Sequence, residues 1–409
     1  MMRRVVVTGL GCITPIGNDL ASFWDSIIKG KHGIGPITKF DASDMKVKIA
    51  AEVKNFHPLL YIDKNEIRKT DLFAQYAIAA ATQAVEESGI VHNIAPERLG
   101  VYIGSGIGGI STLIAETEKM LAKGPSRVSP FFVPMMIANI AAALVAIKYQ
   151  AMGPNLPVVT ACATSTHAIG EAFRAIKYGY ADAIIAGGAE ASINALDIGG
   201  FTNCMALSTT NDPDNSSVPF DKRRDGFVMG EGAGVIVLEE YEHAMARNAK
   251  IYCEISGYGN TCDAYHITAP HPHATGSAKM IELAFSDSGL TPDERLYINP
   301  HGTSTPLNDK VETLAIKTAL GDLAYKIPIS STKSMTGHML GAAGGVEAIV
   351  AIKTIETGIV PPIIGYKEKD PDCDLDYVPN KMRKSDIDKA LSLSLGFGGH
   401  NAGILFNKI

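Results

Sequence analysis

The sequence lacks most of the features that mark secreted and membrane proteins. Its six cysteines are scattered and include no C-x-x-C pair, which argues against a disulfide framework and predicts reduced thiols. No uninterrupted apolar stretch approaches the roughly 18 residues that a membrane helix needs. The start of the chain is apolar, but Thr8, Gly9 and Pro15 interrupt it where a signal peptide would be continuous. We therefore expect a soluble, cytoplasmic protein that binds no membrane.

The chain also has fewer basic residues than acidic ones. The 409 residues include 37 Lys and Arg against 43 Asp and Glu, for a net charge of -6. The chain thus has no global basic field of the kind that indicates a nucleic-acid partner. Because 46% of the residues are hydrophobic, we expect a large buried core, arranged as two domains or as two halves of one large domain.

Apolar runs that end in glycine alternate with alanine-rich stretches. "RLGVYIGSG" and "DAIIAGGAE" are typical of buried strands, whereas "DLFAQYAIAAATQAVEESG" is typical of a helix. This alternation predicts an α/β protein. "VVVTGLGCITPIG" near residue 5 is similar to "CEISGYGNTCDAYH" near residue 253, which indicates a duplication with halves at residues 1–250 and 251–409. Chance is the alternative explanation, because a single similarity of this length also arises between unrelated segments.

Three segments carry patterns with competing interpretations. "GSGIGG" at residues 104–109 fits a dinucleotide-binding loop, but the acidic residue expected about 20 positions later is missing, which disfavours nicotinamide binding. His266, His271 and His273 lie among turn formers, which favours a surface loop over a metal site. The polar segment at residues 209–226 is predicted to be a surface excursion.

Cys162 lies in "VVTACATSTHAIGEAF", directly before a predicted helix. Ile169, Ala172, Phe173 and Ile176 follow helical spacing, so a helix that begins near residue 163 would bury one stripe. Unpaired amides and the helix dipole at a helix N-terminus favour a thiolate and lower the pKa of the thiol. Free cysteine is also a common core residue, so this stretch alone supports a nucleophile and a core filler equally.

Two distant histidines favour the nucleophile. His301 occurs in "INPHGTSTPLND", and His338 follows Lys333 in "STKSMTGHMLGAAGG". Both lie in turns rich in glycine and hydroxyl side chains, where glycine permits close backbone approach and small hydroxyls line polar channels. Together with Cys162 they predict one site.

These motifs, with "RRVVVTGLGCITPIG", "PFDKRRDGFVMGEGAG" and "GFGGHN", resemble the β-ketoacyl-acyl carrier protein synthases, closest to type II, over nearly the whole chain. The resemblance implies a homodimer with a thiolase-like fold, in which two similar halves form a five-layer α-β-α-β-α sandwich. It implies an acyltransferase of fatty acid elongation that condenses malonyl-acyl carrier protein with a Cys-bound acyl chain to give 3-oxoacyl-acyl carrier protein. Acyl carrier protein is then the partner, and no cofactor is required.

The same resemblance assigns roles to residues. Cys162 would carry the acyl chain, with the backbone N–H groups of Cys162 and Phe397 as the oxyanion hole. His301 and His338, as neutral donors, would stabilise the enolate left by decarboxylation, and Lys333 would support the site electrostatically. Phe397 also matches the gate residue. The substrate-binding positions are Ile107 and Phe201 in the acyl pocket, Thr303 and Thr305 beside the pantetheine arm, and Thr268.

The resemblance further implies a structural monovalent cation at Asn299, Glu347 and Ser392, beside a buried acidic pair, Asp309 and Glu312. A buried hydrogen-bond network without an ion fits these residues equally well.

Lys64, Arg68 and Lys69 match a basic patch that docks the carrier protein. Lys64 and Arg68 are four apart on a predicted helix, where like charges are mildly destabilising, which suits a partner-facing role. Asp63 and Glu66 lie beside them, so a solvated face without a partner is the alternative.

The chain departs from the family pattern at four positions. Leu393 and Leu395 replace the usual Asn and Phe, and Pro300 and Asn308 replace Ala and Gly. Leu395 removes an aromatic from the gate loop, so the resemblance implies no particular chain-length preference.

Other condensing enzymes fit less well, with one exception. Type III synthases carry asparagine in place of His338, thiolases carry a second cysteine in the C-terminal glycine motif, and non-catalytic chain-length factors lack the nucleophile. A polyketide ketosynthase with the same Cys-His-His trio stays open.

Overall fold

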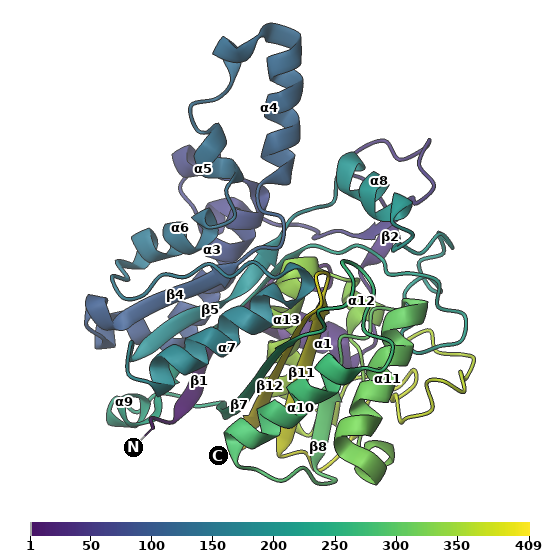
Figure 1. Ribbon diagram of the computed structural model, residues 1–409. Helices are drawn as coiled ribbons and strands as arrows, with labels where there is room; N and C mark the ends of the chain where they lie inside the picture. Colours follow the sequence, from purple (N-terminus) through teal and green to yellow (C-terminus); the bar gives the residue numbers. More distant parts are fainter. Residues whose placement is uncertain (1) are drawn as a thin grey trace.

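Eight of the apolar runs form one hydrogen-bonded sheet in the computed structural model, which describes residues 2–409 (Figure 1). The order is β4-β5-β6-β1-β7-β12-β11-β8. These strands are β1 (Val5–Ile13), β4 (Leu99–Gly104), β5 (Ala183–Glu190), β6 (Gly232–Glu240), β7 (Cys253–Cys262), β8 (Leu296–Asn299), β11 (Lys389–Gly396) and β12 (His400–Asn407). Two small sheets pair β2 (Ile34–Pro36) with β3 (Ile49–Ala51) and β9 (Ile359–Val360) with β10 (Arg383–Lys384).

The helices divide into a central pair, two outer groups and peripheral elements. They are α1 (Leu20–Ile28), α2 (Lys64–Ile67), α3 (Leu72–Ser88), α4 (Ile110–Lys123), α5 (Phe132–Met136), α6 (Ile140–Tyr149), α7 (Thr164–Lys177), α8 (Ala195–Asn203), α9 (Tyr241–Ala246), α10 (Thr275–Ser288), α11 (Pro306–Leu320), α12 (Lys333–Thr336) and α13 (Ala343–Thr357).

The layers follow from which faces of the strands are apolar. Both faces of the central strands are buried, so each face needs a helix against it. α7 and α13 pack against each other in the middle, α3 and α6 cover one outer face, and α10 and α11 cover the other (Figure 1). This confirms the predicted five-layer α/β sandwich. The two halves of the sheet join where Val5 to Val7 of β1 pair with β7.

The two halves repeat the same close packing of strand on helix. A Cβ on Gly9 would lie 2.1 Å from the carbonyl oxygen of Ala84 in α3, and one on Gly257 would lie 2.0 Å from that of Ala284 in α10. Both strands therefore need glycine at the equivalent position, because any side chain would push the helix away. The similarity between the two sequence segments thus corresponds to a structural repeat.

The prediction of a surface excursion at residues 209–226 is wrong for its central part. Phe220 and Asp221 are fully buried. The Val218 N–H donates to Ser304 Oγ (2.9 Å), and the Phe220 N–H donates to Asp309 Oδ2 (2.7 Å). The polar composition of this segment suggested exposure. Buried polar groups are tolerated when each has a hydrogen-bond partner, so composition alone did not reveal the burial.

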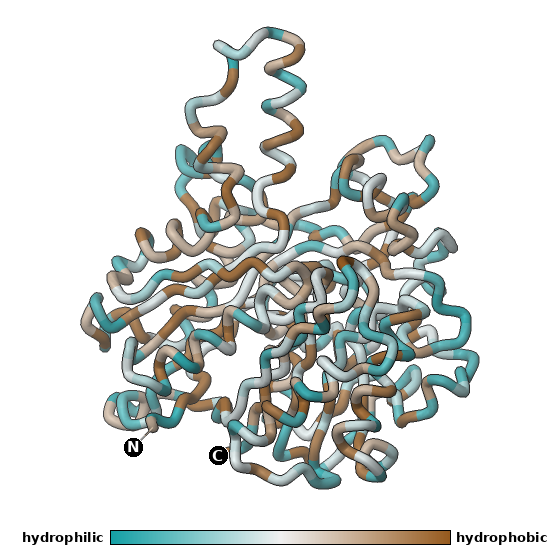
Figure 2. Tube along the Cα trace, in the orientation of Figure 1, coloured by the Kyte–Doolittle hydropathy of each residue, from teal (hydrophilic) through white to brown (hydrophobic). Residues whose placement is uncertain are grey.

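α4 and α5 form an arm that projects from the body, with apolar residues interspersed along it (Figures 1 and 2). Within residues 2–409, none of the helices has both the length and the hydropathy required to cross a bilayer.

Candidate active site

Cys162 occupies the turn that starts the central helix α7. A short 3-10 turn, Ala161–Ala163, runs directly into α7, and the Thr160 N–H donates to Thr164 Oγ1 (2.9 Å) across the junction. Ala161 adopts a left-handed backbone conformation with φ 51°. The helix start predicted near residue 163 is confirmed.

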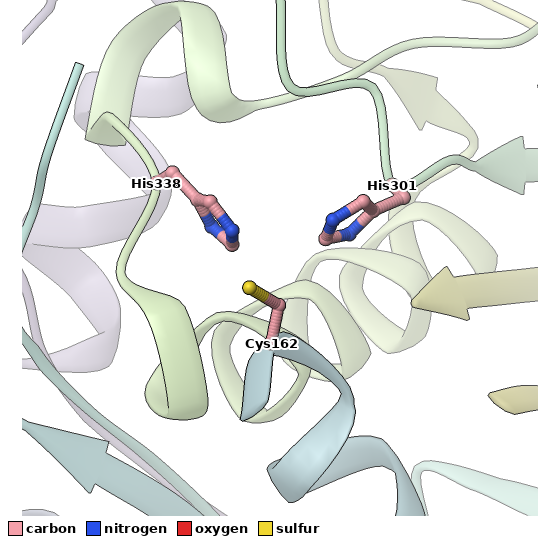
Figure 3. A group of neighbouring side chains, drawn as sticks. All are labelled: Cys162, His301 and His338. Atoms are coloured by element: carbon pink, nitrogen blue, oxygen red, sulfur yellow. The ribbon is translucent and has the colours of Figure 1, made fainter. Parts of the chain in front are cut away.

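The cysteine and the two predicted histidines meet in one place. The sulfur of Cys162 and a ring nitrogen of each histidine all lie within 4.8 Å of one another. Figure 3 shows the sulfur directed between the two imidazoles. The rings are nearly perpendicular, with centroids 5.1 Å apart. Three residues that are spread over more than 170 positions of the sequence thus form one constellation.

The thiol is not activated in the way that the helix start predicts. Burial raises the pKa of Cys162 to about 12, since a thiolate would lose its solvation there. The charge of Lys333 and the backbone N–H groups of Phe397 and Cys162 act in the opposite direction but do not prevail. The expected lowering is therefore wrong, and Cys162 rests as a thiol.

The two histidines are neutral. Burial, followed by the positive charge of Lys333, holds the pKa values of His301 and His338 well below the usual range. Neutral imidazole keeps one N–H donor, as the enolate chemistry requires. Nδ1 of His301 and both ring nitrogens of His338 are buried without a hydrogen-bond partner among the described residues. These atoms are available to a ligand.

Lys333 and Glu312 hold the backbone around His301. The Lys333 ammonium donates to the carbonyl oxygen of His301 (2.6 Å) and forms a buried ion pair with Glu347. The carboxylate of Glu312 accepts the N–H groups of His301 (2.6 Å) and Gly302 (2.7 Å). Burial raises the pKa of Glu312 to about 8. Asp309 is fully buried as well.

A cavity of about 350 Å³ opens onto the trio. Four of the five predicted substrate-binding residues line it, namely Phe201, Thr268, Thr303 and Thr305 without Ile107. Ile107 instead packs against the apolar cluster that contains Cys162. Phe397 and Leu395 also line the cavity, and the Phe397 ring lies 6.3 Å from that of Phe201.

The histidine-rich loop is a wall of this cavity through Thr268 and Pro270. His266 and His273 are exposed, as predicted for a surface loop. Within residues 2–409, the catalytic trio is the one group of three or more His, Cys, Asp or Glu side chains close enough to share a metal.

Glu190 is a buried residue of the site that the sequence analysis missed. Its carboxylate accepts Ser105 Oγ (2.8 Å), the Gly106 N–H (2.9 Å) and the Gly341 N–H (3.0 Å), and Ile107 N–H also donates to it (3.2 Å). These bonds explain why "GSGIGG" does not form a phosphate cradle, since its amides already face a carboxylate. The sequence did offer one signal for Glu190. A glutamate at the end of a fully buried strand is unusual, because charged side chains are rarely buried without partners.

The predicted cation residues present unpartnered oxygens. Asn299 Oδ1, Ser392 Oγ and Glu347 Oε2 are buried and have no hydrogen-bond partner among the described residues. Asn299 and Ser392 are register partners on β8 and β11. Oxygen atoms of this kind fit a hard cation.

The three predicted docking residues lie around α2. Lys64 and Arg68 are exposed, and Lys69 pairs with Glu66 (2.7 Å). α2 has only four residues, and Arg68 is its C-cap with helical backbone angles, so Lys64 and Arg68 are spaced along one short helical turn.

Comparisons with known proteins agree with this geometry. Residues 2–244 match the model of the beta-ketoacyl synthase N-terminal domain, and residues 252–367 match that of the C-terminal domain. A 3-oxoacyl-[acyl-carrier-protein] synthase 2 from Synechocystis sp. is 53% identical over 99% of this chain and 98% of its own length.

Two solved structures share the fold over their full lengths and that of this chain. The ishigamide ketosynthase/chain length factor is 36% identical with a TM-score of 0.93. A type II polyketide synthase complex of a ketosynthase with its acyl-carrier protein is 35% identical with a TM-score of 0.90. From its sequence matches, its fold and its Cys-His-His site, the chain belongs to the beta-ketoacyl synthase family.

Proposed function

We propose that the protein is a 3-oxoacyl-acyl carrier protein synthase that elongates fatty acyl chains by decarboxylative condensation. The observation that carries the proposal is the meeting of one thiol and two neutral imidazoles at the end of a cavity. The relative at 53% identity, named 3-oxoacyl-[acyl-carrier-protein] synthase 2, supports fatty acid elongation.

In the first step, Cys162 takes the acyl chain from the carrier protein. The sulfur attacks the thioester carbonyl, and the N–H groups of Cys162 and Phe397, which face the sulfur, stabilise the oxyanion. Because the thiol starts protonated, its proton passes to one of the neighbouring imidazoles and then to the departing carrier thiolate. The products are the acyl-enzyme and free carrier thiol.

In the second step, malonyl-carrier protein loses CO2. The electron pair of the broken C–C bond moves onto the thioester as an enolate, whose oxygen accepts hydrogen bonds from His301 and His338. The enolate carbon attacks the acyl-enzyme carbonyl, and collapse of the tetrahedral intermediate expels the Cys162 thiolate. The thiolate takes up a proton, and 3-oxoacyl-carrier protein leaves.

The substrate residues divide along the cavity. Thr268, Thr303 and Thr305 line the cavity and offer hydroxyl groups for the pantetheine arm. The Oγ1 atoms of Thr303 and Thr305 lie 2.9 Å apart. Phe201 and Ile107 belong to the apolar cluster around Cys162, which suits an acyl chain. Phe397 lines the same cavity beside Phe201 and acts as the gate to the acyl pocket.

Partners are acyl carrier protein and a second copy of the chain. Lys64, Arg68 and Lys69 receive the acidic carrier protein. The homodimer is supported by exposed apolar side chains, namely Leu121, Phe131 and Val133 on the projecting arm and Leu156 and Val159 on the segment before Cys162. Six free cysteines suit the cytoplasm. Light scattering of the purified protein tests the dimer.

No cofactor takes part in the chemistry, but a structural monovalent cation fits Asn299, Glu347 and Ser392. The unpartnered buried oxygens favour it over a closed hydrogen-bond network. Such an ion would occupy the lone pairs of these oxygens and link β8 to β11 through Asn299 and Ser392. Exchange of potassium for N-methylglucamine should lower the thermal midpoint, and an unchanged midpoint would contradict the site.

An elongation assay with carrier-bound primers of graded chain length tests the proposal. Formation of 3-oxoacyl-carrier protein from fatty acyl primers is the expected result. Failure with every fatty acyl primer, with condensation of polyketide intermediates instead, would indicate a polyketide ketosynthase.

A further inference from the structure

His338 lacks the hydrogen bond that normally orients a catalytic histidine. Histidines at active sites are usually held by a partner on one ring nitrogen, which fixes both the tautomer and the ring orientation. His338 is only 2% exposed, yet neither of its ring nitrogens has a partner among the described residues. Its orientation must therefore come from packing.

The backbone of His338 is fixed by the segment at residues 227–230. The His338 N–H donates to the Val228 carbonyl (2.7 Å), and the Gly230 N–H donates to the His338 carbonyl (2.8 Å). Met229 and His338 form a parallel bridge. These bonds fix the position of the His338 backbone, but they do not fix the rotation of its imidazole ring.

The ring of Phe227, from the same segment, meets the imidazole edge to face. The two centroids are 5.1 Å apart and the planes are inclined at 78°. This is the geometry that aromatic quadrupoles prefer. The Phe227 ring also packs against Phe201, with centroids 5.6 Å apart.

Phe227 is itself firmly placed. It is 4% exposed, its N–H donates to the Ala206 carbonyl (2.9 Å), and its carbonyl accepts the Ser208 N–H (2.9 Å). A ring held by main-chain bonds on both sides of its Cα is a rigid surface for its neighbour.

We propose that Phe227 is a positioning residue of His338: together with the perpendicular ring of His301, its ring sets the plane of the imidazole in place of the missing hydrogen bond. The inference rests on the proposed function, because it needs His338 to donate to the malonyl thioester oxygen. Phe227 lines the same cavity as Cys162 and belongs to its apolar cluster, but the proposed effect of its ring is on decarboxylation, through His338. Loss of the ring should therefore damage decarboxylation more than acylation.

The test compares Phe227→Leu with the wild-type enzyme in two separate half-reactions. Decarboxylation of malonyl-carrier protein is followed as CO2 release, and acylation of Cys162 is followed by intact mass. We expect kcat of decarboxylation to fall about 10-fold with KM within about 2-fold, because small misplacements of a catalytic group cost rate rather than binding. Acylation should stay within about 2-fold of wild type.

Phe285→Leu is the matched control, since Phe285 is a similarly buried ring (7% exposed) on α10, in the core of the C-terminal half. It should leave both half-reactions unchanged. Equal loss of decarboxylation in the two variants would overturn the inference, as would a wild-type rate in Phe227→Leu.

A second pair of variants covers a possible folding defect in the leucine variant. Phe227→Tyr keeps the ring, whereas Phe227→Met keeps much of the volume without a plane. We expect the tyrosine variant to decarboxylate faster than the methionine variant, and equal rates would overturn the inference. Absence of decarboxylation in the wild-type enzyme would overturn the proposed function itself, and the inference with it.

Discussion

The turns that begin the two central helices have the same shape but carry different chemistry. In the N-terminal half, the 3-10 turn Ala161–Ala163 leads into α7, and in the C-terminal half the 3-10 turn Leu340–Ala342 leads into α13. The first residue of each turn has a left-handed backbone, with φ 51° at Ala161 and 47° at Leu340. The middle residue is Cys162 in one half and Gly341 in the other.

The surroundings explain why only one half carries a nucleophile. A Cβ on Gly341 would lie 2.4 Å from the Gly106 nitrogen and 2.7 Å from the Glu190 carboxylate. The C-terminal turn is thus packed against the loop that leads to Ile107, whereas the N-terminal turn opens onto the cavity. The repeat supplies two equivalent helix starts, and the packing at each one determines whether a side chain fits.

Replacing the nucleophile of the N-terminal turn should have the largest effect. Cys162→Ala removes the atom that holds the acyl chain, so condensation should fall by at least about 10³-fold. The mass of the variant should not change on incubation with acyl-carrier protein. Undiminished condensation would contradict the assignment.

Replacing either histidine of the C-terminal half should come next. His301→Ala or His338→Ala removes one donor to the enolate and should slow malonyl decarboxylation by about 10²–10³-fold. Acylation of Cys162 should survive in each single variant because the other imidazole can still take the thiol proton. In the double variant acylation should slow as well, and unchanged acylation there would show that the proton leaves by another route.

A side chain in the C-terminal turn should reduce stability. Gly341→Ala forces a methyl group against Gly106 and Glu190, and we expect a loss of about 1–3 kcal/mol in the free energy of unfolding. Gly35→Ala is the control, since a Cβ there has no neighbour within 4 Å. Denaturant titration measures both variants. Equal stabilities would mean that the two turns are not distinguished by packing.

The smallest expected effect concerns pH. Burial and the charge of Lys333 hold the pKa of His338 well below 6.5, so its imidazole stays neutral as the pH falls through that value. Decarboxylation should therefore change less than about 2-fold between pH 7.5 and 6. The folded protein resists protonation of this group and the unfolded chain does not, so stability should decline below pH 6.5. An acid limb near pH 6.5 in the decarboxylation rate would contradict the assignment.

The sequence allowed the strands, the central helices and the meeting of Cys162, His301 and His338 to be predicted because each has a local pattern or a motif. The pKa of Cys162 could not be predicted in this way, since burial by distant segments outweighs the local helix start. Glu190 was missed because its partners come from two distant stretches of chain, residues 105–107 and Gly341. The burial of Phe220 was missed because its polar neighbours find their partners beyond residue 300.

The buried stretch around Phe220 also bears on how the molecule folds. Although it precedes the second half of the repeat, it is anchored to Ser304, Asp309 and the carbonyl of Lys333, and its ring stacks on Tyr377 with centroids 4.1 Å apart. Separating the halves near residue 250 would expose this ring and remove the Phe220 N–H from the buried carboxylate of Asp309. Because the halves share these buried contacts, we expect them to unfold together as one cooperative unit.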